Sequence, residues 1–196
     1  MSFKICVSGA ADGSCLNKET LSRAEEVGVA IAKAGAILVT GATTGIPNAA
    51  AKGVKKAGGI SIGFSPAASR IDHINRYKLP TQYMDLTVYT GFGYAGRNLI
   101  LTRSADAVII ICGRIGTLNE FTVAFEDKKP LGVLENSGGM ADELETITHI
   151  AHRHECKVIY EPDPKKLVSS LIEDLKSKYK EDPEKLKPAT TVEDPD

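Results

Sequence analysis

The sequence predicts an α/β fold in which helices cover both faces of a doubly wound, mostly parallel sheet. Short apolar segments bounded by turn residues alternate along the chain with longer amphipathic segments of helical period. Glycine-rich turns follow three of the expected strands. Because strands that alternate with helices pair in parallel, their carboxyl ends, and with them these turns, are expected at one edge of the sheet.

Each expected element rests on a local pattern. Runs of apolar residues predict strands at Lys4–Gly9, Ala36–Thr40, Gly59–Phe64, Leu86–Thr90, Asp106–Cys112, Pro130–Leu134 and Lys157–Tyr160. Amphipathic periodicity predicts helices at Glu19–Ala34, Pro47–Lys56, Tyr94–Ser104, Leu118–Lys128, Met140–His152 and Pro164–Tyr179. Gly35 ends the first helix, and residues 65–84, which contain Pro66 and Pro80, are expected to be irregular.

Length and composition predict one globular domain over residues 1–180, followed by a flexible acidic tail over residues 181–196. The chain is 42% hydrophobic and 25% charged, with a net charge of −1, so the body lacks the basic excess of a nucleic-acid-binding surface. No apolar run approaches the roughly 20 residues of a membrane helix, and the N-terminus has no signal-peptide pattern. We therefore expect a cytoplasmic protein with neither a membrane nor a nucleic-acid partner.

The chain has four cysteines, none in a Cys-x-x-Cys pair: Cys6, Cys15, Cys112 and Cys156. We expect them to be buried, reduced thiols. His149, His152 and His154, close to Cys156, suggest a metal site. However, His149 and His152 are expected on a helix, whereas His154 and Cys156 fall in the following turn and at the start of the next strand. Cations near a helix C-terminus explain them better, and no metal is predicted.

The most informative stretch is 105–120. Ala107 to Ile111 predict a strand buried on both faces, Gly113 and Gly116 predict a tight turn, and Thr117 is expected to open a helix. Free N–H groups and the positive end of the helix dipole then point into the turn. A strand, a glycine turn and a helix N-terminus in this order predict a site for a phosphorylated ligand.

Two further glycine turns follow strands, at Ser8–Ser14 and Gly41–Gly45, and we expect one cleft between all three. The sequence has no GxGxxG pattern at the first turn and no GxxxxGK[ST], which disfavours NAD-type and P-loop sites. The candidate ligand-binding residues are Ser8, Gly9, Gly41, Thr43, Thr44, Gly45, Gly113, Arg114, Gly116 and Thr117.

Simpler interpretations exist for the charged residues. Thr117-x-x-Glu120 before an apolar stripe is also a capping box, in which glutamine could replace Glu120 without loss of stability. Arg97 alone suggests a solvated helix arginine, and Arg114 a surface charge. For Asp12 there are two interpretations: its carboxylate binds a ribose hydroxyl of the ligand, or it forms an Asx turn, as Asp in a glycine-rich turn usually does.

The motif Gly113-x-x-Gly116-Thr117-x-x-Glu120 resembles the P-G-G-x-G-T-x-x-E signature of the Lonely Guy (LOG) family, once labelled lysine-decarboxylase-like. Arg97-Asn98, the second glycine turn, Gly58-Gly59-x-x-x-Gly63 and Lys129-Pro130 resemble other segments of that family, so that the likeness spans residues 3–135. The Ile-Gly-Thr turn is most similar to the branch of molybdenum-cofactor carrier proteins. The resemblance implies a Rossmann-like fold.

The resemblance also implies a chemistry and an assembly. LOG enzymes hydrolyse the N-glycosidic bond of nucleoside 5′-monophosphates, and their catalytic Arg and Glu match Arg97 and Glu120. Arg114 replaces the second glycine and Asn98 replaces a lysine, which favours binding over hydrolysis. We expect a carrier of a phosphorylated nucleotide-like or molybdopterin-type ligand, with no required cofactor and the molybdenum cofactor as one candidate ligand; the alternative is the hydrolase. The helices expected at Tyr94–Ser104 and Leu118–Phe125 are apolar over a broad face. LOG-like proteins pair through helices of this kind, so a homodimer or a dimer of dimers is expected.

Overall fold

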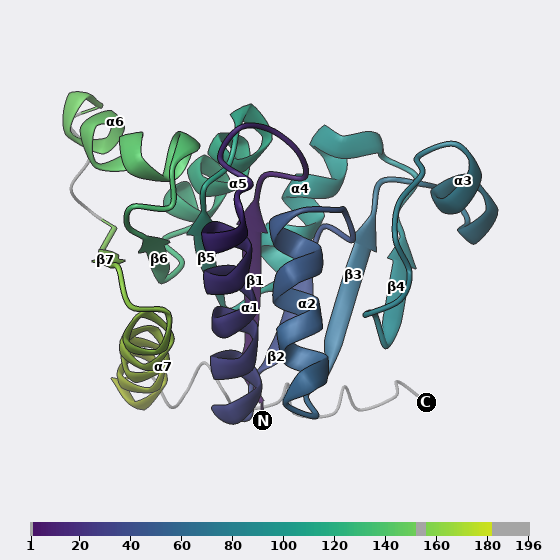
Figure 1. Ribbon diagram of the computed structural model, residues 1–196. Coiled ribbons are helices and arrows are strands. Elements are labelled where there is room, and N and C mark those ends of the chain that lie inside the picture. Colours follow the sequence, from purple (N-terminus) through teal and green to yellow (C-terminus); the bar gives the residue numbers. More distant parts are fainter. Residues whose placement is uncertain (1, 152–155, 182–196) are drawn as a thin grey trace, which may run out of the picture.

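The structure, a computed structural model, describes residues 2–151 and 156–181 and contains one seven-stranded sheet of order β4-β3-β2-β1-β5-β6-β7 (Figure 1). All strand pairs in these residues are parallel. The strands are β1 (Lys4–Gly9), β2 (Ile37–Thr40), β3 (Ser61–Ser65), β4 (Leu86–Tyr89), β5 (Ala107–Ile111), β6 (Leu131–Leu134) and β7 (Val158–Glu161). The predicted doubly wound α/β fold is confirmed.

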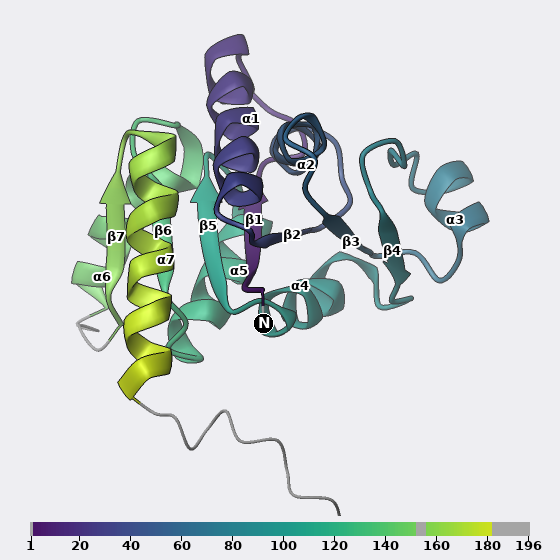
Figure 2. The ribbon, with the colours of Figure 1, turned by 90° about the horizontal axis from the view of Figure 1, so that it is seen from below.

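Helices cover the sheet on both sides, with α1, α2 and α7 on one face and α4, α5 and α6 on the other (Figure 2). The helices are α1 (Lys18–Lys33), α2 (Ile46–Lys56), α3 (Arg70–Asn75), α4 (Gly93–Ser104), α5 (Ile115–Glu126), α6 (Leu144–Ile150) and α7 (Pro164–Glu181), and a 3₁₀ turn, η1 (Gly139–Glu143), precedes α6.

Alternation along the central strands builds the two cores. In β1, Ile5 and Val7 pack with α1, α2 and α7, whereas Cys6 packs with Leu101 of α4 and Phe121 of α5 on the opposite face. All five residues of β5 are fully buried. A strand that is apolar on both faces is therefore explained by helices on both sides of the sheet.

The chain reverses its direction of winding between β1 and β5, which are neighbours in the sheet although they lie far apart in sequence. The register pairs Gly9 with Ile111, so the loops that follow these two strands leave the sheet side by side. This is the topological switch point at which parallel α/β sheets bind ligands. In Figure 1 the loop after β1 lies at the top of the view, above the carboxyl ends of the strands.

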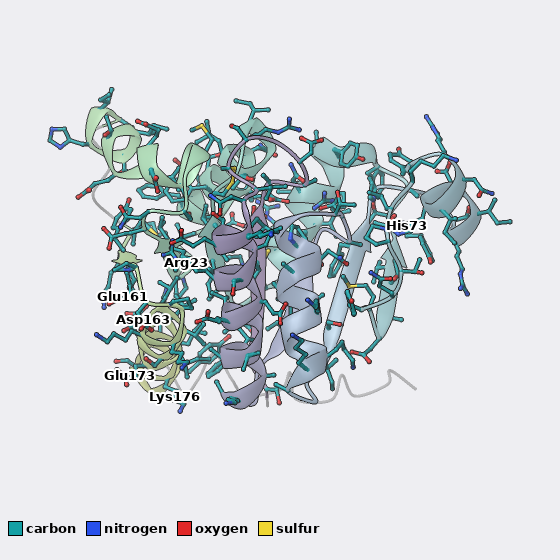
Figure 3. All side chains as sticks on the ribbon, in the orientation of Figure 1. Arg23, His73, Glu161, Asp163, Glu173 and Lys176 are labelled. Atoms are coloured by element: carbon teal, nitrogen blue, oxygen red, sulfur yellow. A yellow bond between two sulfur atoms is a disulfide. The ribbon has the colours of Figure 1, made fainter. Side chains whose placement is uncertain are left out.

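Arg23 of α1 ties this edge of the sheet together. Its guanidinium donates to the carbonyl oxygens of Glu135 (2.7 Å), Asn136 (2.8 Å) and Pro162 (2.8 Å), which belong to the segments after β6 and β7. Figure 3 shows Arg23 reaching from α1 toward those segments. The bond network satisfies carbonyl groups that loops leave unpaired, and it fixes the start of α1.

Three element predictions need correction. Residues 65–84 are not wholly irregular, because Ser69 caps the short helix α3 by accepting a hydrogen bond from the Asp72 amide (3.1 Å). The helix expected from Leu118 begins at Ile115. The segment expected as one helix from Met140 divides into η1 and α6, and its end at His152 lies outside the described residues.

The cysteine prediction is wrong for one pair. Cys15, in the loop after β1, and Cys112, just after β5, form a disulfide with their Cα atoms 6.2 Å apart. Cys6 is fully buried and free, as predicted, and burial together with the nearby Glu120 raises the pKa of its thiol well above the ordinary value. Cys156 is a free, half-buried thiol. The disulfide joins the two loops of the switch point.

No helix among residues 2–151 and 156–181 combines the length and the apolar character needed to cross a bilayer. The expected tail over residues 181–196 lies outside the described residues, apart from Glu181, at which α7 ends.

A thiol titration tests the disulfide. In denaturant without reductant, the wild-type protein should show only the two thiols of Cys6 and Cys156, and reduction should expose the other two. The variant Cys15→Ser should show one thiol more than the wild type before reduction, because Cys112 loses its partner. Four reactive thiols in the unreduced wild-type protein would contradict the pairing.

Candidate functional site

A cleft of about 360 Å³ lies at the carboxyl ends of β1 and β5. Four segments surround the cleft: the loop after β1, the loop after β2, helix α4 and the start of α5. The lining residues are Gly9, Ala10, Ala11, Asp12, Thr43, Tyr94, Arg97, Asn98, Arg114, Gly116, Thr117 and Glu120.

A buried ion pair forms the floor of the cleft. Arg97 of α4 donates from Nη1 to Oε1 of Glu120 of α5 at 3.0 Å, and the side chains are only 6% and 7% exposed. Ser8, at the end of β1, donates its hydroxyl proton to the other carboxylate oxygen of Glu120. Burial raises the pKa of the Glu120 carboxyl above its ordinary value, against the lowering effects of Arg97 and Ser8.

Asn98 adds a third donor to this carboxylate. The amide orientation that satisfies its surroundings has the nitrogen donating to Glu120 Oε1 (3.0 Å) and to the carbonyl oxygen of Tyr94 (2.9 Å). The departure from the LOG pattern at Asn98 therefore lies in the cleft itself. The Nε atom of Arg97, by contrast, is buried without a hydrogen-bond partner in the described structure.

Two of the simpler interpretations are wrong. Arg97 is not a solvated helix arginine, since it is buried against Glu120. The Thr117–Glu120 capping box does not form: α5 starts three residues earlier than that interpretation requires, its N-cap is Arg114, and no side chain caps it. Glu120 turns its carboxylate to β1 and α4 instead, because a buried charge gains more from a buried partner than from an amide of its own helix.

Two glycines are required by close packing. Gly113 has φ +102°, and a Cβ atom there would collide with the side chain of Thr117. At Gly41, a Cβ atom would collide with the guanidinium of Arg97. Gly113 therefore allows the tight entry into α5, and Gly41 makes room for the buried ion pair rather than for a ligand.

The outer end of the cleft carries a second, exposed ion pair. Arg114 Nη1 lies 2.6 Å from Asp12 Oδ1, and these side chains are 63% and 70% exposed. Arg114 stands at the start of α5, a twelve-residue helix whose first N–H groups have no side-chain cap. Uncapped N–H groups, the positive end of the helix dipole and a guanidinium together favour an anion at this end.

The structure brings together only part of the predicted site. Seven predicted residues line the cleft: Gly9, Thr43, Arg97, Arg114, Gly116, Thr117 and Glu120. Five do not. Ser8 binds Glu120, Gly41 and Gly113 give room to neighbours, Thr44 donates to the Ala11 carbonyl oxygen (2.8 Å), and Gly45 begins α2.

The sequence analysis missed Ala10, Ala11 and Tyr94 as lining residues, and it weighed Asp12 and Asn98 without placing them in the site. A signal for two of them was available. Tyr94, Arg97 and Asn98 are spaced i, i+3, i+4, which puts them on one face of a helix. A ligand role predicted for Arg97 therefore extends to its two neighbours on α4.

A somewhat larger hollow of about 430 Å³ lies away from these loops, among several lysines. Its lysines already have partners. Lys129 donates to the Ala105 carbonyl oxygen (2.6 Å), Lys178 donates to the Lys128 carbonyl oxygen (2.6 Å), and Lys157 pairs with Asp174 (2.9 Å). We therefore take the cleft at the switch point as the candidate site.

A metal interpretation receives no support from geometry. No group of three or more His, Cys, Asp and Glu side chains within the described ranges is arranged to hold a metal ion. His152 and His154, which suggested such a site in the sequence, lie outside these ranges.

The family model of the SLOG cluster4 family matches residues 2–168. The chain belongs to the SLOG cluster4 family. A relative from Archaeoglobus fulgidus is 33% identical over 133 residues, which cover 68% of this chain and 80% of that protein. The family assignment confirms the resemblance to the LOG-like Rossmann superfamily that the glycine turns indicated.

Solved structures similar to this SLOG chain include two proteins of molybdenum cofactor binding or transport. The molybdenum cofactor binding protein from Rippkaea orientalis is 28% identical, with a TM-score of 0.72 and coverage of 89% of this chain and 98% of that one. The molybdenum cofactor carrier protein from Chlamydomonas reinhardtii is 26% identical, with a TM-score of 0.70 and coverage of 90% and 99%. The likeness to the carrier branch is thereby confirmed.

Substitution of the buried carboxylate tests the ion pair. Glu120→Gln should lower the free energy of unfolding by about 3–5 kcal/mol, because it leaves the Arg97 charge buried without its counter-ion. The measurement is a urea titration, with Glu26→Gln on the exposed face of α1 as the matched control. A capping box would tolerate glutamine, so an unchanged midpoint would contradict the ion pair.

Proposed function

We propose that this chain is a binding or carrier protein for a phosphorylated, ring-bearing ligand, either a nucleotide or a molybdopterin-type compound, held in the cleft at the switch point. The observation that carries the proposal is the state of Glu120. Both of its oxygens accept hydrogen bonds from the chain's own Ser8 and Arg97, and a carboxylate so engaged is not free to activate water. The floor of the cleft is thus built to hold its shape.

The phosphate is assigned to the start of α5. There the free N–H groups of the first turn, including those at Gly116 and Thr117, face the cleft that these residues line, and Arg114 supplies a charge-assisted donor. Arg114 occupies the place of a glycine in the LOG signature, so its side chain takes over contacts that the backbone makes in that pattern.

The ring is assigned to the α4 side of the cleft. Tyr94 is half exposed and lines the cleft, and its ring, which meets Tyr77 in a T-shaped contact (centroids 5.6 Å apart), supplies an aromatic surface for a base or a pterin. The similarity to proteins described as binding or carrying the molybdenum cofactor supports the pterin. A nucleotide and a molybdopterin-type compound each combine a flat ring with a phosphate, which is why both are part of the proposal.

The second candidate is hydrolysis of nucleoside 5′-monophosphates to free base and ribose 5-phosphate. One observation favours it: Arg97 and Glu120, the residues that match the LOG catalytic pair, are in contact on the cleft floor. In that reaction Glu120 would stabilise the oxocarbenium-like centre or activate water, and Arg97 would hold the carboxylate or the phosphate. This reaction requires that substrate binding breaks the hydrogen bond between Ser8 and Glu120.

The proposal also names a setting. A carrier of this kind acts in the cytoplasm, on a small ligand, with no resident cofactor, membrane or nucleic-acid partner. The four charged side chains that line the cleft are two acids and two bases, which gives a neutral site for one small anion rather than a basic track for a polyanion.

Incubation with AMP separates the two functions. The wild-type protein should bind AMP in calorimetry and release no adenine detectable by chromatography. Arg114→Ala should weaken binding by about 1.5–3 kcal/mol, the contribution of a charge-assisted hydrogen bond, whereas Arg70→Ala, an exposed arginine of α3, should not. Steady release of adenine by the wild-type protein would establish the hydrolase instead.

We further propose that two copies of the chain pair through the surface around α4 and the edge strand β4. Large apolar side chains are exposed there, with Phe92 68%, Leu86 56% and Leu99 40% accessible. The register places Leu86 beside Ile62 of β3, on the sheet face that α4 covers only in part. Exposed apolar side chains on and next to a helix that lines the cleft favour a two-fold homodimer, or a dimer of dimers.

Light scattering tests the assembly. The wild-type protein should have the mass of a dimer or tetramer at micromolar concentration, and Leu99→Glu should shift it toward the monomer because a charge on a buried interface is left unpaired. Ile150→Glu, which alters an exposed isoleucine of α6, is the control and should leave the mass unchanged. A monomeric wild-type protein would reject the proposal.

A further inference from the structure

The cleft contains two ion pairs of opposite character. The inner pair, Arg97 with Glu120, is almost completely buried, and the outer pair, Asp12 with Arg114, is mostly exposed. These are the only charged side chains among the residues that line the cleft. Each cation of the cleft is therefore already matched by an anion of the chain.

An entering phosphate must take one of these cations from its present partner. Breaking the buried pair would strand a charge away from water, which is strongly unfavourable. An exposed ion pair contributes little stability, because water solvates both partners once they separate. The exchange therefore takes place at Arg114, where the uncapped start of α5 also attracts the anion.

We propose that Asp12 is a specificity-determining residue, an internal anion that the ligand's phosphate displaces from Arg114, so that its competition limits how strongly the outer end of the cleft prefers charged ligands over neutral ones. This inference rests on the proposed binding function and deepens it. A neutral ligand leaves the Asp12–Arg114 pair intact and gains nothing from Arg114. A ligand with a phosphate replaces a single carboxylate by a group of higher charge and more acceptor oxygens.

The loop that carries Asp12 is held in place from both sides. The Cys15–Cys112 disulfide ties it to the strand end beside Gly113, and Thr44 donates to the Ala11 carbonyl oxygen at 2.8 Å. A displaced Asp12 carboxylate consequently stays near the bound phosphate. It keeps competing with the phosphate for Arg114, which lowers the affinity for anionic ligands without closing the cleft.

The test compares AMP with adenosine, which differ only in the phosphate. In Asp12→Asn, calorimetry should give an affinity for AMP about three- to fivefold higher than that of the wild-type protein, the upper part of the range that exposed ion pairs contribute, and an unchanged affinity for adenosine. Glu19→Gln, which removes an exposed carboxylate of α1 outside the cleft, is the matched control and should alter neither affinity.

A second substitution isolates the mechanism. In an Arg114→Ala background, Asp12→Asn should change the affinity for AMP by less than twofold, because no cation remains for which Asp12 competes. The full gain in that background would overturn the displacement, and so would a gain of equal size for adenosine. A loss of AMP affinity in Asp12→Asn would show a direct contact with the ligand and would also overturn it.

The outcomes separate this inference from the function on which it rests. If the wild-type protein binds AMP and Asp12→Asn does not improve binding, only the role of Asp12 fails. If the wild-type protein and Asp12→Asn both fail to bind AMP, the nucleotide form of the binding function and the role of Asp12 in it are overturned together.

Discussion

The buried pair between Arg97 and Glu120 is the interaction on which the site depends. It joins α4 to α5, and Ser8 extends it to β1, so three elements from distant parts of the sequence meet at one carboxylate. Burying two charges is costly, and only close contact and complete hydrogen bonding offset that cost. Gly41 is part of the same arrangement, because any side chain there would collide with the guanidinium.

The two ends of the cleft have different roles: the inner ion pair supports the structure, and the outer end attracts the ligand. Since the inner charges satisfy one another, the net attraction for an anion comes from the outer end, where α5 begins with an uncapped turn at Arg114. That end is also cross-linked, by the disulfide between the loops after β1 and β5. A rigid outer rim around a neutral floor suits a protein that holds a ligand more than one that must move groups during a reaction.

The sequence was sufficient for the fold and insufficient for the contacts. Buried parallel strands and glycine turns have local signatures, so the strands and the position of the cleft were predictable. The contact of Glu120 with Ser8 was not, because the capping-box pattern is local whereas Ser8 lies 112 residues away. The disulfide was missed for the same reason: its cysteines are 97 residues apart, and nothing in their spacing indicates that β1 and β5 are neighbours.

The glycine turns show that a glycine near a ligand cleft can serve the protein itself. All three turns were predicted to surround one cleft, and each contributes lining residues, yet Gly41 gives room to the arginine, Gly45 starts a helix and Gly113 gives room to Thr117. Glycine in a turn reports that something comes close, and the approaching group is as often another part of the protein as a ligand. What selects the ligand at this switch point is then carried by side chains that the glycine pattern does not contain, Asp12 and Arg114 at the rim and Tyr94 on α4.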